Sequence, residues 1–86
     1  MVRWEYTIRD RQGLHARPIA QIAAALMKRQ CRAVISGRRG DADAKDMMAM
    51  MGLGAGVGEV LTFSFEGRDE DAASEELQNL LVRLGL

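Results

Sequence analysis

The chain has 86 residues, 48% of them hydrophobic, and its 12 lysines and arginines balance its 12 aspartates and glutamates. This size suits a single domain over residues 1–86 with a modest core, and the apolar content excludes intrinsic disorder. The balanced charge argues against nucleic acid or anionic lipid as a partner, and the apolar runs are too short to span a bilayer.

Two features of the sequence bear on its compartment. No charged and apolar leader opens the chain, which argues against export. Cys31 is the only cysteine, so an internal disulfide is impossible, as suits a reducing cytoplasm. We therefore expect a cytoplasmic protein without membrane insertion. A monomer is expected separately, and so is the absence of a metal or cofactor.

The first third of the chain predicts a strand, a turn and a helix. Hydrophobic and polar residues alternate from Val2 to Ile8, the period of a strand buried on one side. Arg11-Gln12-Gly13 then turns the chain. From Ala16 to about Arg29 apolar residues recur at helical spacing, and Pro18 fits the first turn, where backbone amides lack an intrahelical partner. The expected buried face of this helix consists of Ile19, Ile22, Ala23 and Leu26.

The middle of the chain predicts a hairpin and a short helix. Ala33-Val34-Ile35 forms a short strand closed by the turn Gly37-Arg38-Arg39-Gly40, whereas Asp41-Ala42-Asp43 is a weak strand candidate because aspartate is depleted in strands. Asp46 is expected to cap the helix that follows. Its carboxylate can accept hydrogen bonds from the amides of Met48 and Ala49.

Glycines alternate with other residues from Gly52 to Gly58. Glycine-rich loops can cradle phosphates, but this one lacks the lysine spacing of a Walker motif and follows a helix instead of opening one. We interpret it as a plain connecting loop and do not expect ATP or NAD binding.

The last third predicts a strand and a helix. Val60 to Phe65 alternates in hydrophobicity, and a helix with acidic residues in its first turn begins near Asp69 and stops before Gly85. Its expected buried face consists of Ala73, Leu77, Leu80, Leu81 and Leu84. The predicted order is β-α-β-β-α-β-α. It suggests an α+β fold, an open two-layer sandwich with a mostly antiparallel four-stranded sheet and all three helices on one face.

His15, the only histidine, is the candidate functional residue. A lone histidine is more often structural than catalytic. Here it lies where the first helix begins, so the amides of Ala16 and Arg17 and the helix dipole can hold a phosphoryl group beside the ring. The Arg17 guanidinium can pair with phosphate oxygens, and phosphoryl transfer to imidazole needs mainly positioning and positive charge. The pattern favours a phosphoryl carrier with a phosphohistidine intermediate rather than a stand-alone enzyme.

Three segments carry a resemblance to a known family: Gly13-Leu14-His15-Ala16-Arg17-Pro18, Ala44-Lys45-Asp46-Met47-Met48 with Met51-Gly52-Leu53-Gly54, and Glu66-Gly67-Arg68-Asp69-Glu70-Asp71-Ala72. They resemble HPr, the histidine phosphocarrier of the phosphoenolpyruvate-dependent phosphotransferase system, nearly end to end. The resemblance implies the open-faced sandwich of that family. It also implies that enzyme I phosphorylates His15 on Nδ1, that Arg17 binds the phosphate, and that His15 passes the group to the IIA domains of sugar permeases.

The methionines of the second helix predict a docking surface. Met48 and Met50 lie about 160° apart on a helix, so the methionines here cannot all face one core stripe. Met50 is expected to lie in the hydrophobic core. The resemblance implies that the other methionines form an adaptable apolar patch, which two small residues of the first helix extend. The expected methionine patch consists of Met47, Met48, Met51, Ala20 and Ala24.

Asp46 departs from the family pattern, because many members carry there a serine that a dedicated kinase phosphorylates. One interpretation is a good helix cap. The other is a regulatory position whose fixed negative charge partly imitates phosphoserine and weakens docking to enzyme I. Under both interpretations the kinase switch is expected to be absent.

Two alternative functions stay open at this point. A regulatory HPr paralogue, such as a nitrogen-related branch or a carrier feeding a kinase system, is compatible with Asp46, which removes one sign of the sugar-repression role. A non-catalytic protein-binding module would use only the methionine patch and would take up no phosphate.

Overall fold

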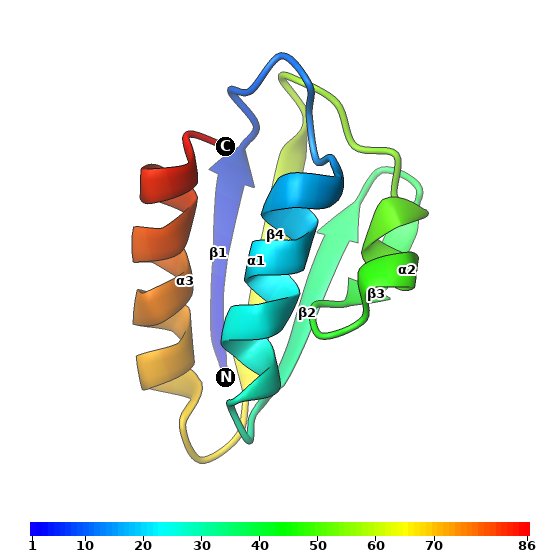
Figure 1. The fold of residues 1–86 in the computed structure, drawn as a ribbon. Helices are drawn as coiled ribbons and strands as arrows, with labels where there is room; N and C mark the ends of the chain where they lie inside the picture. The colour runs from blue at the N-terminus through cyan, green and yellow to red at the C-terminus, as the bar shows by residue number, and fades with distance from the viewer.

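The computed structural model describes all 86 residues and shows two layers, a four-stranded sheet with its helices packed on one face (Figure 1). The elements are β1 (Val2–Thr7), α1 (Ala16–Met27), β2 (Arg32–Gly37), β3 (Gly40–Asp43), α2 (Met47–Met51), β4 (Val60–Glu66) and α3 (Glu70–Leu84). The predicted α+β class and order of elements are confirmed. No helix combines the length and the apolar content that crossing a bilayer requires.

The sheet has the strand order β1-β4-β2-β3, and each pair of neighbours is antiparallel. In the central strand β4, Phe63 lies opposite Trp4 of β1 on one side and opposite Ile35 of β2 on the other. The indole ring of Trp4 stacks on the phenyl ring of Phe63, with the ring centroids 4.7 Å apart. Successive hydrophobic residues of three strands therefore meet on the covered face of the sheet.

The weak strand candidate at Asp41-Ala42-Asp43 is a true strand, β3. It occupies the edge of the sheet, where Ala42 pairs with Ile35 and is buried while Asp41 and Asp43 are exposed. An edge strand tolerates charged side chains on its open face, so the low β propensity of aspartate is outweighed by the pairing that the preceding turn imposes.

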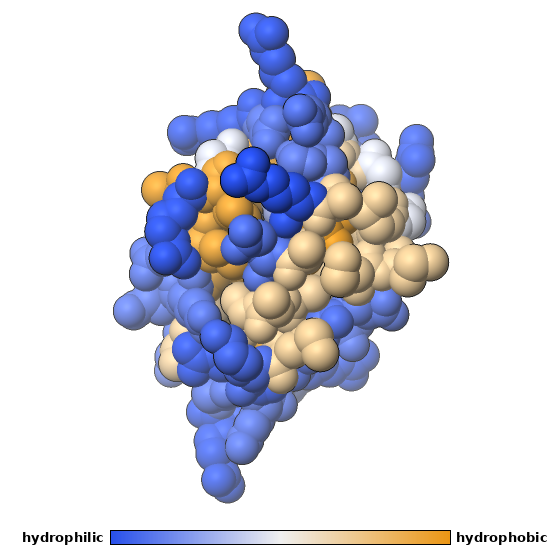
Figure 2. Space-filling view, viewed as in Figure 1, coloured by the Kyte–Doolittle hydropathy of each residue, from blue (hydrophilic) through white to orange (hydrophobic).

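In the helix layer, α1 lies between α2 and α3 and packs against both (Figure 1). The outward surface of this layer is not uniformly polar. Figure 2 shows weakly hydrophobic atoms gathered in one area over α1 and α2, bordered by hydrophilic side chains.

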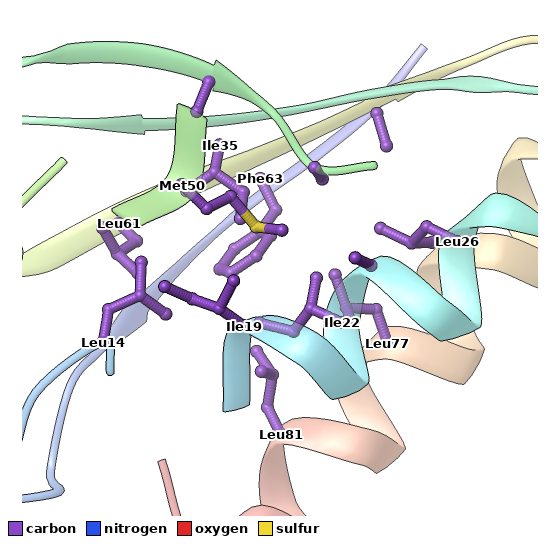
Figure 3. Packing of buried hydrophobic residues seen from close by; sticks show 14 of the residues in the cluster. Leu14, Ile19, Ile22, Leu26, Ile35, Met50, Leu61, Phe63, Leu77 and Leu81 are labelled. Carbon is purple, nitrogen blue, oxygen red and sulfur yellow. The ribbon is translucent and has the colours of Figure 1, made fainter. Parts of the chain in front are cut away.

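The core lies between the two layers and contains 22 buried residues. Figure 3 shows Ile19 and Ile22 of α1 facing Phe63 of the sheet, with Leu77 and Leu81 approaching from α3. Burying one such side chain contributes roughly 1.5–3 kcal/mol, so this cluster supplies the main driving force for joining the layers. The expected buried faces of α1 and α3 are confirmed except at one position.

That exception lies at the end of α3. Leu84 is only half-buried, and Leu86 fills the core in its place. Gly85 adopts a left-handed conformation with φ of 69°, which ends the helix and turns the chain back so that Leu86 points inward. The expectation followed helical spacing to the last apolar residue and missed this reversal.

Candidate functional site

The loop between β1 and α1 is fixed by a close contact with the loop that follows α2. Gly13 has a φ of +70°, and a Cβ atom built on it would lie 2.5 Å from the carbonyl oxygen of Ala55. The amide of Leu14 donates a hydrogen bond to the same oxygen at 2.9 Å, and the Leu14 side chain is buried. Glycine is therefore required at position 13 both by its conformation and by the lack of space.

The glycine-rich segment is consequently more than the plain connecting loop expected from the sequence. Besides holding Leu14, it reaches Ile8 at the end of β1. Gly58 donates to the Ile8 carbonyl at 2.8 Å, and Ile8 donates to the Glu59 carbonyl at 3.0 Å. The buried Glu59 carboxylate accepts from the Arg38 and Gly56 amides at 3.0 and 3.4 Å. These backbone donors, that of Arg38 above all, lower the pKa of Glu59.

His15 occupies the N-cap of α1. Its backbone is extended, with φ of −100° and ψ of −179°, and its carbonyl accepts the Ile19 amide at 3.1 Å, the first bond of the helix. The imidazole makes no capping hydrogen bond, so the ring stays available. Neither the Ala16 nor the Arg17 amide donates to another backbone group, which leaves two donors at the positive end of the helix dipole for an anion.

A cleft of about 240 Å³ opens beside the ring. It is lined by Asp10, Gln12, His15, Arg17, Pro18, Arg83 and Leu84. The structure therefore brings together the two predicted residues His15 and Arg17. Ala16 does not line the cleft, and its exposed position leaves it only a backbone contribution.

Two charged lining residues were not among the site residues predicted from the sequence. Asp10 places its Oδ2 atom 3.3 Å from Nε2 of His15, and Arg83 adds a second guanidinium from the last turn of α3. The only signals were an acidic residue in the turn before the histidine and a basic residue near a helix C-terminus, where the dipole alone explains it. Neither signal shows that the end of α3 meets His15.

The end of the chain holds these elements together. The carbonyl of Leu86 accepts the amides of Arg9 and Asp10, the latter at 2.8 Å. Since Leu86 is buried in the core, the end of α3 and the histidine loop form one unit. The cleft is therefore built from two parts of the sequence, residues 10–18 and 83–84, around a single histidine.

The predicted methionine patch is exposed in the structure. Met48 is 83% exposed, Met47 and Met51 are close to half exposed, and Met50 between them is fully buried as predicted. Their neighbours on α1 are Ala24, which is exposed, and Ala20, which is half-buried. The weakly hydrophobic area over α1 and α2 in Figure 2 agrees with these positions.

Comparison with known proteins decides the family, because residues 2–83 match the family model described as the PTS HPr component phosphorylation site. The chain belongs to the HPr family. It is 34% identical over 82 residues to the phosphocarrier protein HPr of Lysinibacillus sphaericus, covering 95% of this chain and 93% of that one. The protein is thus a phosphoryl carrier of the phosphotransferase system.

Solved HPr structures share the fold described above. The histidine-containing phosphocarrier protein of Mycoplasma superposes with a TM-score of 0.96 at 25% identity, covering 99% of this chain and 97% of that one. HPr-C-His of Thermoanaerobacter tengcongensis gives a TM-score of 0.88 at 30% identity, covering 99% and 94%. The open-faced arrangement predicted for the family is confirmed.

Asp46, the residue that departs from the expected family pattern, is exposed and caps α2. Its Oδ1 atom accepts the Ala49 amide at 3.1 Å, but the second bond expected from Met48 is not formed. Cap side chains bond the amide of either N2 or N3, and here the carboxylate bonds N3. The carboxylate forms no ion pair, so its charge faces solvent next to the methionine patch.

Proposed function

We propose that His15 is the phosphorylated residue, accepting a phosphoryl group from enzyme I and passing it to IIA domains of sugar permeases. The observation that carries this proposal is the position of the only histidine, which lines one cleft with the guanidinium groups of Arg17 and Arg83. This positive environment suits the transferred group, whose charge is spread over three oxygens in the transition state.

The transfer itself needs little covalent chemistry from the protein. A ring nitrogen of His15 attacks phosphorus with its lone pair, a nitrogen–phosphorus bond forms, and the donor leaves with the electrons of the bond that breaks. Arg17 and the free amides of Ala16 and Arg17 offset the negative charge of the oxygens. Because a neutral imidazole already carries a lone pair, no separate base is required. The reverse sequence delivers the group to the next carrier.

The methionine patch supports the assignment of partners. Enzyme I and a IIA domain must each approach the same ring in line, so one surface beside the ring has to accept both. Exposed methionines adapt to differently shaped partners because the side chain is unbranched and flexible. We assign Met47, Met48, Met51, Ala20 and Ala24 to this surface. We assign the protein to the cytoplasm as a monomer, in which no second copy covers the surface.

Asp46 adds a fixed charge to the edge of this surface. An aspartate has no hydroxyl for a kinase to modify, so the serine switch of other family members is absent from this chain. The carboxylate also carries less charge than a phosphoserine. Its proposed effect is a modest and permanent weakening of docking to enzyme I, in addition to its role as a helix cap.

One incubation tests the phosphocarrier assignment. The protein is mixed with phosphoenolpyruvate and enzyme I, and the intact mass is recorded before and after mild acid. One acid-labile phosphoryl group is expected on the wild type and none on His15→Ala with the same circular dichroism spectrum. Absence of uptake by the wild type would instead favour a binding module. Transfer to sugar-specific against nitrogen-related IIA domains then separates the two branches of the family.

A further inference from the structure

We propose that Asp10 is a positioning residue for His15: its carboxylate holds the Nε2–H group of the ring, so that Nδ1 presents the lone pair to phosphorus. The proposal rests on the proposed function of His15 and adds to it a residue outside the predicted site. Its starting point is the 3.3 Å contact between Oδ2 of Asp10 and Nε2 of His15.

The carboxylate is held in place by its own backbone and by the turn that it starts. The Asp10 amide donates to the Leu86 carbonyl at 2.8 Å, and the Asp10 carbonyl accepts the Gly13 amide at 2.9 Å. The other carboxylate oxygen, Oδ1, accepts the Gln12 amide at 2.9 Å. With Oδ1 committed to the turn, Oδ2 is left facing the ring.

The ring has no other side-chain partner. His15 makes one side-chain hydrogen bond, the contact with Asp10, and its nitrogen Nδ1 makes none. A carboxylate can only accept, so the nitrogen facing it must be the one that carries hydrogen. The neutral ring therefore has its proton on Nε2 and its lone pair on Nδ1.

The charges around the ring agree with a proton on Nε2 and a lone pair on Nδ1. A phosphoryl group would be repelled by Asp10, whereas Arg17 and Arg83 line the same cleft and attract it. The Gln12 amide above all, and then His15, lower the pKa of Asp10, so the carboxylate stays charged at neutral pH. Asp10 thus acts on the ring through Nε2, and the nitrogen that takes the phosphoryl group is the other one.

The same contact assists the transfer in both directions. When Nδ1 attacks phosphorus, the proton remains on Nε2 and positive charge develops on the ring, which the neighbouring carboxylate stabilises. When the group moves on, the nitrogen–phosphorus bond breaks and its electrons return to Nδ1. The imidazole, which is the leaving group of this step, is then neutral again with Nε2 still protonated. No proton therefore has to be supplied or removed.

A simpler role for Asp10 would be to build the turn, and two substitutions separate the roles. Asp10→Asn keeps an acceptor for the Gln12 amide but turns its NH2 group toward Nε2, which favours the tautomer with hydrogen on Nδ1. Asp10→Ala loses both functions. A positioning role predicts that asparagine is at least as harmful as alanine, whereas a turn-building role predicts that asparagine restores the wild type.

The tautomer can be read directly, because the chain has one histidine and gives one set of imidazole signals. We expect nitrogen-15 chemical shifts at a pH where the ring is neutral to report hydrogen on Nε2 in the wild type and a shift toward Nδ1 in Asp10→Asn. Phosphorylation by enzyme I should fall roughly tenfold in Asp10→Asn and Asp10→Ala, as for other residues that orient a reactive histidine.

Glu75→Ala is the matched control, since Glu75 is an exposed carboxylate on α3 without a hydrogen bond or ion pair, and it should retain the wild-type rate. An Asp10→Asn protein with the wild-type tautomer and the wild-type rate would overturn the proposal. The nitrogen-15 measurement uses unphosphorylated protein. A failure of phosphate uptake by the wild type would therefore count against the phosphocarrier assignment and leave the measured tautomer to decide on Asp10.

Discussion

The carbonyl oxygen of Ala55 lies 2.9 Å from the amide nitrogen of Leu14, and through this bond the loop after α2 holds the residue that precedes His15. The end of α2 and the start of α1 are thereby joined through the backbone of these two loops.

Gly13→Ala should destabilise the protein and slow transfer. A Cβ atom at a φ of +70° that meets the Ala55 carbonyl oxygen at 2.5 Å forces the two loops apart. We expect a loss of about 1–3 kcal/mol in the free energy of unfolding by urea. Gly56→Ala is the control, because nothing lies within 4 Å of its added Cβ. Equal losses in both variants would contradict the assigned contact.

Arg83→Ala should slow phosphorylation by enzyme I by roughly threefold to tenfold, the loss of one partly solvated ionic hydrogen bond. Arg83 lines the cleft from the last turn of α3. The measurement is a single-turnover rate at several salt concentrations. The exposed Arg68 serves as control, and the prediction is wrong if Arg68→Ala slows the reaction equally.

Met48→Asp should impair transfer without unfolding the protein. Met48 is 83% exposed, so its substitution removes no core contact, while a buried charge in a docked complex is costly. We expect the KM of enzyme I for the variant protein to rise about tenfold, as it does when a central interface residue is changed. Met27→Asp alters a methionine that is 68% exposed at the other end of α1 and should leave the KM unchanged. A Met48→Asp protein that unfolds, or one that transfers with the wild-type KM, would contradict the docking interpretation.

The two roles of Asp46, helix cap and fixed negative charge, can be separated by substitution. Asp46→Asn and Asp46→Ser keep an oxygen for the Ala49 amide and remove the charge, so enzyme I should phosphorylate both faster than the wild type. Asp46→Ala should lose about 1 kcal/mol of stability because the cap is gone. Equal phosphorylation rates in the asparagine, serine and wild-type proteins would leave only the cap.

Glu59 should contribute to stability in a pH-dependent way. Its pKa in the folded protein lies below the ordinary value of 4.5, so its stabilising effect is complete above pH 4.5 and is lost as the pH falls through the folded pKa. Glu59→Gln should therefore be less stable than the wild type at pH 7, with a difference that shrinks in acid. Urea unfolding at several pH values measures this difference, and Glu75→Gln should show none of it.

Most of the fold could be predicted because burial on one side imposes a period. Trp4 and Phe63 alternate with polar residues since their strands have one covered face, and Ile19 and Ile22 recur at helical spacing since α1 lies on that face. Likewise Pro18 marked the start of α1 and thereby placed His15 at the helix end. Each of these patterns depends only on the strand or helix to which the residue belongs.

The rest of the site depends on contacts between distant segments. Asp10 belongs to the turn before α1 and Arg83 to the end of α3, and only the buried Leu86 brings that end against the turn. The role of Ala55 is equally invisible, because its contribution is a backbone carbonyl that any residue could offer. Such groups have no residue-type signature, whereas histidine and arginine at a helix end do.

The bond between Leu14 and Ala55 has a consequence for how this surface can vary. Loops on protein surfaces usually accept insertions, since lengthening a closed loop costs little entropy. The segment 52–58 is different, because an added residue would change the separation between the methionine patch and the imidazole. We therefore expect the length of this segment to stay constant among functional relatives, as for a spacer that sets the reach of the transfer.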